Sequence, residues 1–366
     1  PELVRITGPH EGGAAPFALV DTDLDCIPDL WIAGDEPAAW DLTAEPKKLA
    51  SLPALEGAIS FAIGDVDEDG IADLVISDGK EVRIQRGEAG RIPDFEERIS
   101  TVVAAATDLM LADIDMEGDL DLLLASGKGP VQLSLNEGRN FRSLEDSPDL
   151  GSRQRVDKII AVRDLDHDHD PDLLLIGETL SWISGAPQWQ FSENPEQRPL
   201  TAGAPIAATS ALLVDVDGQL GAELVLLQDG KLRILRRAGT VKDAPGKAIF
   251  DGEVSLPAEI TSETFETIAA ADLDLDGTQE ILLGSTSRTS ILHHIDGVPL
   301  LSSRSFPAAV NIVVGDVDGD GDMDVLSASP SDNKVAWYEN DGSGNFSPHT
   351  ITASVSGVRS VFAADV

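Results

Sequence analysis

Short apolar runs alternate with acidic loops along the chain, and this alternation predicts its secondary structure. In IGDVDEDGIADLVIS, at residues 63–77, three acids alternate with other residues, Gly70 follows, and Asp73 opens the next apolar run. The flanking runs are apolar at both odd and even positions, so we expect short strands that are covered on both faces. Two such strands around a tight loop predict a β-hairpin.

The acidic loop occurs seven times, with 44, 48, 51, 51, 57 and 44 residues between successive first acids. Further alternating segments, such as KEVRIQRG (80–87) and KLRILRR (231–237), bring each unit to four strands. A linear β-solenoid has a shorter period, and paired helices would need a 3.6-residue periodicity that these runs lack. The sequence therefore predicts an all-β fold, a β-propeller of four-stranded blades with seven repeats and the start of another, hence seven or eight blades. We expect one propeller domain over 1–366, with repeats at 15–57, 58–105, 106–156, 157–206, 207–264, 265–308 and 309–356, and the first strand of a further repeat at 357–366.

The acids at positions 1, 3, 5 and 9 of each loop, counted from the first acid, form the pattern of a cation site. Calcium binds six to eight oxygens from carboxylates, carbonyls and water, and a glycine at position 6 allows a sharp turn. One such loop alone is commonly a solvated turn, and an EF-hand needs a twelve-residue loop between helices. Seven in-phase copies between strands instead predict several Ca²⁺ ions per chain. In the 65 loop, named like the others by its first acid, the expected ligands are Asp65, Asp67, Asp69, a bidentate Asp73 and the carbonyl of Ile71.

The other six loops are expected to use the corresponding acids, and they differ in completeness. The 316 loop is complete, the 272 loop has Glu280 at position 9, and the 113 loop has Glu117 at position 5. Cys26 and His169 replace the glycine in the 21 and 164 loops, which makes the turn harder, and Gln219 helps make the 215 loop the weakest. Whether the 164 and 215 loops bind metal is left open. The expected ligands are Asp21, Asp23, Asp25 and Asp29; Asp113, Asp115, Glu117 and Asp121; Asp164, Asp166, Asp168 and Asp172; Asp215, Asp217 and Glu223; Asp272, Asp274, Asp276 and Glu280; and Asp316, Asp318, Asp320 and Asp324.

The charge of the chain favours cations as partners. The chain has 26 basic and 65 acidic residues, a formal charge of -39, and 27 of the acids occupy the loop positions. This balance argues against binding of nucleic acid or an anionic membrane surface. Cys26 is the single cysteine, so an intrachain disulfide is excluded. The chain has no run of 18 apolar residues, so the sequence predicts no membrane span in it.

The run DVDGDGDMDVLSASPSDNKVAWYENDGSGNFSPHTI, at 316–351, resembles the FG-GAP/VCBS repeat family, the calcium-loop propeller repeats related to those of integrin α-subunits. The resemblance extends over nearly the whole chain. It implies a propeller whose metal loops join the first and second strands of each blade, often in a secreted or surface protein that mediates adhesion or binds a ligand. The final VRSVFAADV repeats an apolar strand and a first acid, Asp365, so we expect the chain to be a fragment of a longer one.

The sequence contains none of the common catalytic motifs. The zinc motif HExxH, the nucleophile elbow GxSxG, the Walker loop and the dinucleotide fingerprint are all missing. His167 and His169 lie within a metal loop, and His293 and His294 are adjacent, so surface or loop roles are favoured over transition-metal ligation. Among the aromatic residues, Trp31 and Trp337 lie in predicted strands and are expected to pack between blades, whereas Trp40, Trp182 and Trp189 are the candidate sugar contacts.

Together these observations predict a non-enzymatic, calcium-binding propeller with a protein or glycan partner. The location expected is extracellular, at the cell surface or periplasmic, because calcium modules that work outside cells bind the ion at about 10⁻⁴–10⁻³ M. Two alternatives stay open, a carbohydrate-active enzyme such as a lyase or hydrolase, and an accessory module of a larger catalytic protein.

Overall fold

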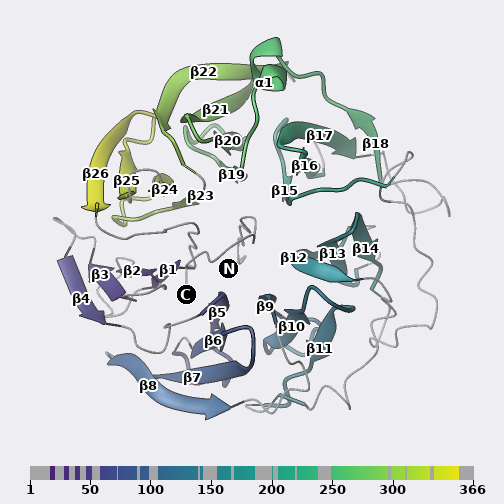
Figure 1. Cartoon of the computed structure of the whole chain (residues 1–366), viewed down its shortest axis with the longest axis vertical. Coiled ribbons are helices and arrows are strands. Elements are labelled where there is room, and N and C mark those ends of the chain that lie inside the picture. The colour runs from purple at the N-terminus through teal and green to yellow at the C-terminus, as the bar shows by residue number, and fades with distance from the viewer. Residues whose placement is uncertain are drawn as a thin grey trace. The chain divides into compact units, whose positions relative to one another are not determined.

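The computed structural model of the chain consists of small antiparallel β-sheets. The residues that it describes form seven sheets, and in each sheet hydrogen-bonded neighbours follow one another in chain order (Figure 1). The prediction of an all-β fold is therefore confirmed. The structure describes residues 17–20, 29–32, 38–41, 47–51, 58–71, 73–88, 91–98, 106–138, 141–142, 155–165, 169–185, 200, 205–218, 221–237, 249–295, 298–309, 311–329 and 334–353.

The chain divides into two compact units. One consists of residues 58–207, 238–251 and 366, and the other of residues 1–57, 208–237 and 252–365.

The unit centred on residues 58–207 contains three of the sheets. Their strands are β5 (Ser60–Gly64), β6 (Asp73–Ser77), β7 (Val82–Glu88) and β8 (Arg91–Arg98); β9 (Asp108–Ala112), β10 (Asp121–Ala125) and β11 (Gln132–Ser134); and β12 (Val156–Arg163), β13 (Asp172–Gly177) and β14 (Leu180–Ile183).

The other four sheets belong to the second unit, apart from the first two residues of β18. A short helix, α1 (Ala258–Ser262), precedes the sheet that starts with β19. The strands are β1 (Phe17–Val20), β2 (Asp29–Ile32), β3 (Ala38–Asp41) and β4 (Lys47–Ser51); β15 (Ser210–Val214), β16 (Glu223–Gln228), β17 (Lys231–Arg237) and β18 (Phe250–Glu253); β19 (Thr267–Ala271), β20 (Glu280–Gly284), β21 (Arg288–Ile295) and β22 (Val298–Pro307); and β23 (Asn311–Gly315), β24 (Asp324–Ser329), β25 (Lys334–Asn340) and β26 (Phe346–Thr352).

Each acidic loop joins the first two strands of a sheet, as the sequence predicts. Gly64 pairs with Asp73 across β5 and β6, and Gly315 pairs with Asp324 across β23 and β24. The acid at position 9 is therefore the first residue of the second strand. Five of the sheets have the expected four strands, and the other two, β9–β11 and β12–β14, have three within the described residues.

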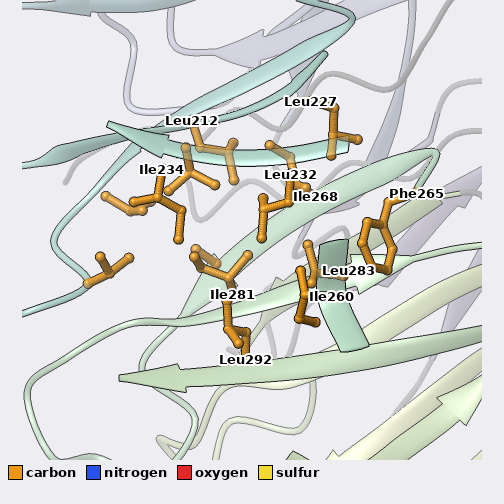
Figure 2. Packing of buried hydrophobic residues seen from close by; sticks show 14 of the residues in the cluster. Leu212, Leu227, Leu232, Ile234, Ile260, Phe265, Ile268, Ile281, Leu283 and Leu292 are labelled. Carbon is orange, nitrogen blue, oxygen red and sulfur yellow. The ribbon is translucent and has the colours of Figure 1, made fainter. Parts of the chain in front are cut away.

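The inner strands are buried on both faces, as their continuous apolar runs predict. Every residue of β6, β10 and β20 is buried. Neighbouring sheets of one unit pack face to face, and Figure 2 shows Leu212, Leu227, Leu232 and Ile234 of one sheet against Ile268, Ile281, Leu283 and Leu292 of the next. Full burial of each such side chain contributes about 1.5–3 kcal/mol. The packing holds the hairpin ends, and with them the acidic loops, in fixed positions.

Candidate metal centres in the acidic loops

The acid at position 9 is the buried anchor of its loop. Asp73 is 2% exposed, and its Oδ2 accepts a hydrogen bond from the Val66 amide at 3.1 Å. Its Oδ1 accepts one from the Gly87 amide of β7 at 2.7 Å. One carboxylate thus joins the loop to the second and third strands. The bond from the amide at position 2 to the acid at position 9 recurs in Ile114–Asp121, Leu165–Asp172, Val216–Glu223, Leu273–Glu280 and Val317–Asp324.

The acid at position 1 shapes the turn. Asp65 accepts hydrogen bonds from the amides of Asp69 at 3.1 Å and Gly70 at 2.7 Å. Gly70 has a φ of 87°, and His169, which replaces the glycine in the 164 loop, has a φ of 79°. A non-glycine residue in this left-handed region costs about 1–2 kcal/mol, which supports the expectation of a harder turn there. The bond from the amide at position 6 to the acid at position 1 recurs in Gly118–Asp113, His169–Asp164, Gly277–Asp272 and Gly321–Asp316.

Position 4 is also left-handed, which the sequence analysis missed. Glu68, Met116 and Leu275 have φ values of 58°, 58° and 57°. Met116 and Leu275 are 54% and 57% exposed, so two apolar side chains stand in solvent on strained backbone. The glycines that occupy this position in the 215 and 316 loops, Gly218 and Gly319, could have revealed the requirement.

Three described loops bring the acids at positions 1, 3 and 9 together. In the 65, 113 and 215 loops, one oxygen of each of these acids lies within 4.8 Å of the other two. The 215 loop, expected to be the weakest, therefore gathers its three acids as well as the others do. In the 272 loop the acids at positions 1, 3 and 5 form such a group, and Asp274 and Glu280 form a second group with His293.

The acid at position 5 helps to close the turn. Asp69 is exposed, and its Oδ1 accepts a hydrogen bond from the amide of Ile71 at 2.9 Å. Asp276 accepts bonds from the amide and the hydroxyl of Thr278 at 2.8 and 2.6 Å. Glu117 in the 113 loop is exposed as well. In the 65 and 272 loops the structure thus gives position 5 a local hydrogen-bonding role beside the metal role that the sequence predicts.

Several expected ligands lie outside the described residues. Asp29 begins β2 opposite Val20, as position 9 does in the other hairpins, and only its backbone is described. The acids outside the described residues are Asp21, Asp23, Asp25, Asp166 and Asp168.

Burial makes the anchor acids hard to ionise. Desolvation raises the pKa of Asp121 and Asp324 from 3.8, and that of Glu223 from 4.5, to about 7 in each case. Hydrogen bonds from backbone amides lower these pKa values, but desolvation is the larger effect. The carboxylate of Asp115 raises the pKa of Asp121 further, and that of Asp318 does the same for Asp324. A nearby positive charge favours the ionised form of such groups, so these loops fit a cation.

A fifth acid, at position 7, enlarges several loops and was missed by the sequence analysis. The runs EGD, DHD and DGD place Asp119, Asp170 and Asp322 there. Burial and neighbouring carboxylates raise the pKa of Asp119 and Asp322. In the 113 loop, one oxygen of Asp119 and one of Asp113 are buried without a hydrogen-bond partner among the described residues. Unsatisfied buried acceptors are costly, and a cation would satisfy them.

The 65 loop, whose sequence is complete, contains an internal cation. The register of β6 and β7, continued one pair beyond Leu74 and Gln85, places Arg86 opposite Asp73. Nη1 of Arg86 donates to Asp73 Oδ2 at 3.0 Å and lies 3.9 Å from Asp67 Oδ2. Burial raises the pKa of Asp73, and the guanidinium acts in the opposite direction. A positive side chain thus touches two of the acids that were expected to bind calcium.

The position opposite the anchor acid is again an arginine in one other sheet and a different residue type in two more. Arg236, His293 and Glu339 occupy it in the sheets of the 215, 272 and 316 loops. His293 Nδ1 lies 3.5 Å from Glu280 Oε1 with the imidazole 23% exposed, so this histidine is in a strand beside an acidic loop, not at the free surface or in a loop. Desolvation and neighbouring carboxylates, Glu339 among them, raise the pKa of Asp318.

Two asparagines connect successive loops, and the sequence analysis missed them as well. The amide of Asn136 donates to Asp121 Oδ1 at 2.8 Å, and its side chain donates to the carbonyl of Val66 in the preceding loop at 2.8 Å. Asn340 makes the same bonds, to Asp324 at 2.7 Å and to Leu273 at 2.7 Å. The local signal is the NEG or NDG turn that ends the third strand.

The described tryptophans are packing residues. Trp182 is 2% exposed in β14, so its assignment as a sugar contact is wrong. Trp337 is 4% exposed, and it stacks on His349 of the neighbouring strand of its own sheet with ring centroids 4.5 Å apart, so the contact is within a sheet and not between blades. Trp189 lies outside the described residues, and only the backbones of Trp31 and Trp40 are described.

Comparison with known proteins identifies the class of the last repeat. Residues 316–366 match the family model for an FG-GAP-like repeat, so the chain contains such a repeat where its sequence most resembles the family. No curated protein matches the chain. Within the part of the chain that the structure describes, no helix is long and apolar enough to cross a membrane.

Solved structures resemble the chain over nearly its whole length. One is a lectin of Agrocybe aegerita that recognises non-reducing terminal N-acetylglucosamine (14% identity, 93% of this chain and 94% of that chain, TM-score 0.53). Another is BBS1N in complex with ARL6DN (12% identity, 95% and 100%, TM-score 0.58). A third is a Bacteroides fragilis protein named as a candidate 6-phosphogluconolactonase (13% identity, 93% and 96%, TM-score 0.56). At these identities the likeness concerns the propeller-like fold alone.

Proposed function

We propose that the chain is a calcium-binding β-propeller module in which each sheet is a blade and several of the acidic loops hold the ions. The observation that carries this proposal is the repeated group of acids around a buried anchor, in which Asp121, Glu223 and Asp324 have pKa values of about 7. Carboxylates arranged in this way repel one another without a cation. The proposal includes closure of the blades into one propeller of seven or eight blades.

The 113 loop illustrates how an ion would be held. Asp113, Asp115 and Asp121 offer oxygens within 4.8 Å of one another, and Asp119 adds a buried acceptor. Calcium supplies the positive charge that lets all four carboxylates ionise, and it would favour the folded chain because the unfolded chain has no such site.

The module is proposed to act without catalysis, by binding a protein or glycan partner outside the cell. The FG-GAP-like repeat and the charge of -39 support this role, since such repeats are typical of surface proteins. The lectin neighbour makes a glycan partner worth testing. Trp182, Trp337 and Tyr338 are buried, so these three side chains offer no stacking surface for a sugar.

Calorimetric titration of Ca²⁺ into chelator-treated protein, with thermal unfolding at each step, tests the proposal. We expect several ions per chain and a rise in melting temperature. Asp121→Asn should remove one ion, whereas Asp157→Asn, at an exposed pair with Arg155, is the matched control and should remove none. Absence of heat, or an unchanged melting temperature in saturating Ca²⁺, would contradict calcium binding.

The partner is tested on glycan arrays that include terminal N-acetylglucosamine, in Ca²⁺ and in chelator, beside a turnover assay on the same polysaccharides. Calcium-dependent binding without turnover would support a glycan-binding module. Turnover would support the alternative of a carbohydrate-active enzyme and refute the non-enzymatic role.

A further inference from the structure

The 272 loop differs from the other described loops because an imidazole joins its acids. Asp274, Glu280 and His293 each offer a ligand atom within 4.8 Å of the other two. The register of β20 and β21, continued one pair beyond Ile281 and Leu292, places His293 opposite Glu280. A nitrogen ligand therefore comes from the third strand, outside the loop itself.

Hydrogen bonds show which atoms of this loop are committed elsewhere. Both oxygens of Asp272 accept backbone amides, at 3.1 and 2.9 Å, and Asp276 Oδ1 accepts the amide and the hydroxyl of Thr278. Glu280 is 2% exposed, and its Oε2 is held by the Leu273 amide at 2.8 Å.

The remaining ligand atoms lie close to one another. They are the carboxylate of Asp274, which no hydrogen bond joins to the described residues, Glu280 Oε1 and His293 Nδ1. A buried carboxylate with one oxygen fixed and the other turned to an imidazole is a well-positioned ligand.

The ligand types select the metal. Calcium and magnesium take oxygen ligands, whereas zinc and its neighbours among the first-row metals bind imidazole and carboxylate together. We propose that Asp274, Glu280 and His293 bind one divalent transition metal, with Zn²⁺ as the representative ion, in preference to calcium. Three protein ligands leave room for water or a partner's side chain in a tetrahedral site. The inference rests on the proposed function only in treating the loop as a cation site.

The test is titration of Zn²⁺ and of Co²⁺ into the chelator-treated full chain in saturating Ca²⁺, with native mass spectrometry to count ions and visible absorption to report a nitrogen ligand on Co²⁺. Loss of an outer-shell partner alone weakens metal binding by about 10–100-fold, so His293→Gln should weaken the site by about tenfold or more. His349→Gln is the matched control, because His349 bonds Glu339 at 2.7 Å and not a residue of the 272 loop.

The outcomes separate this inference from the calcium proposal. One Zn²⁺ bound in excess Ca²⁺, lost in His293→Gln and kept in His349→Gln, supports the inference even if no calcium binds anywhere. Equal Zn²⁺ affinity in wild type and His293→Gln, with unchanged melting temperatures, overturns it and leaves calcium binding standing. The inference is also overturned if wild type binds no Zn²⁺ and His293→Gln gains a Ca²⁺, because His293 would then act as an internal cation.

Discussion

Replacement of Arg86 by methionine is expected to add a calcium ion to the chain. The guanidinium bonds Asp73 at 3.0 Å and lies 3.9 Å from Asp67, two of the acids that would otherwise hold the ion. Methionine retains much of the apolar stem of arginine and removes the charge. The 65 loop should then become a site like the 113 loop, which has Leu135 at the corresponding register position.

The size of the effect follows from Coulomb's law. Two unit charges 4 Å apart interact by about 1 kcal/mol even at the dielectric constant of water, so a fixed guanidinium opposes a divalent ion by about 2 kcal/mol or more. That energy corresponds to a weakening of roughly 30-fold, because 1.4 kcal/mol is tenfold. Without calcium the variant loses a charged hydrogen bond worth about 1.5–3 kcal/mol, so its unfolding should depend more steeply on calcium.

Native mass spectrometry and calorimetry of wild type and Arg86→Met at matched calcium concentrations decide the matter. The control is Arg233→Met, which removes the same charge from a third strand where the partner, Glu253, is 51% exposed. Equal numbers of ions and equal affinities in wild type and Arg86→Met would refute the reasoning. A gain in both arginine variants would show an effect of net charge and not of position.

Three further predictions concern the anchors, the asparagines and the turns. The pKa of Asp121 and Asp324 is about 7 in the folded chain and 3.8 in the unfolded chain, so their contribution to stability is present below about pH 4 and is lost as the pH rises through 7. Protein in chelator should therefore be less stable at pH 8 than at pH 5, and calcium should reverse this difference. A free energy of unfolding that does not change with pH would contradict the prediction. Asn340→Ala leaves two carbonyls without their donor and should cost about 2 kcal/mol in urea unfolding, whereas a loss under about 0.5 kcal/mol would show that the link between loops is unimportant. Leu275→Gly relieves a φ of 57° and should stabilise the chain, and Gly277→Ala, at a φ of 90°, should destabilise it by about 1–2 kcal/mol, with opposite shifts in melting temperature as the check.

The hairpins could be predicted because their information is local. The apolar runs and the acids lie within fifteen residues of one another in IGDVDEDGIADLVIS, and the structure places Asp73 at the first position of β6, as the pattern indicates. The positions 4 and 7 were missed although their signals are equally local. The residues at these positions differ between copies, so no constant residue type marks them in the repeat.

The third-strand residues could not be predicted because their distance from the anchor varies. Arg86 lies thirteen residues after Asp73, and Glu339 lies fifteen residues after Asp324, because the second strand, and with it the paired part of the third, is one residue longer in the sheet of the 316 loop. Only the register of the sheet brings these side chains to the same place. The hydrogen bond from Asn136 to Val66, seventy residues away, likewise depends on tertiary packing.

The repeats share the acidic loop and differ in the third-strand residue beside it. The loop supplies the negative site, and one residue on the third strand stands beside it: the guanidinium of Arg86 in the 65 loop, and in the 272 loop the imidazole of His293, which we propose as a ligand of a transition metal. On this proposal, a single substitution at that residue would change the cation without disturbing the buried anchor, whose amide hydrogen bonds come from the backbone. Cation choice in each repeat can therefore change independently of the fold, and the number of ions bound cannot be counted from the acidic motifs alone.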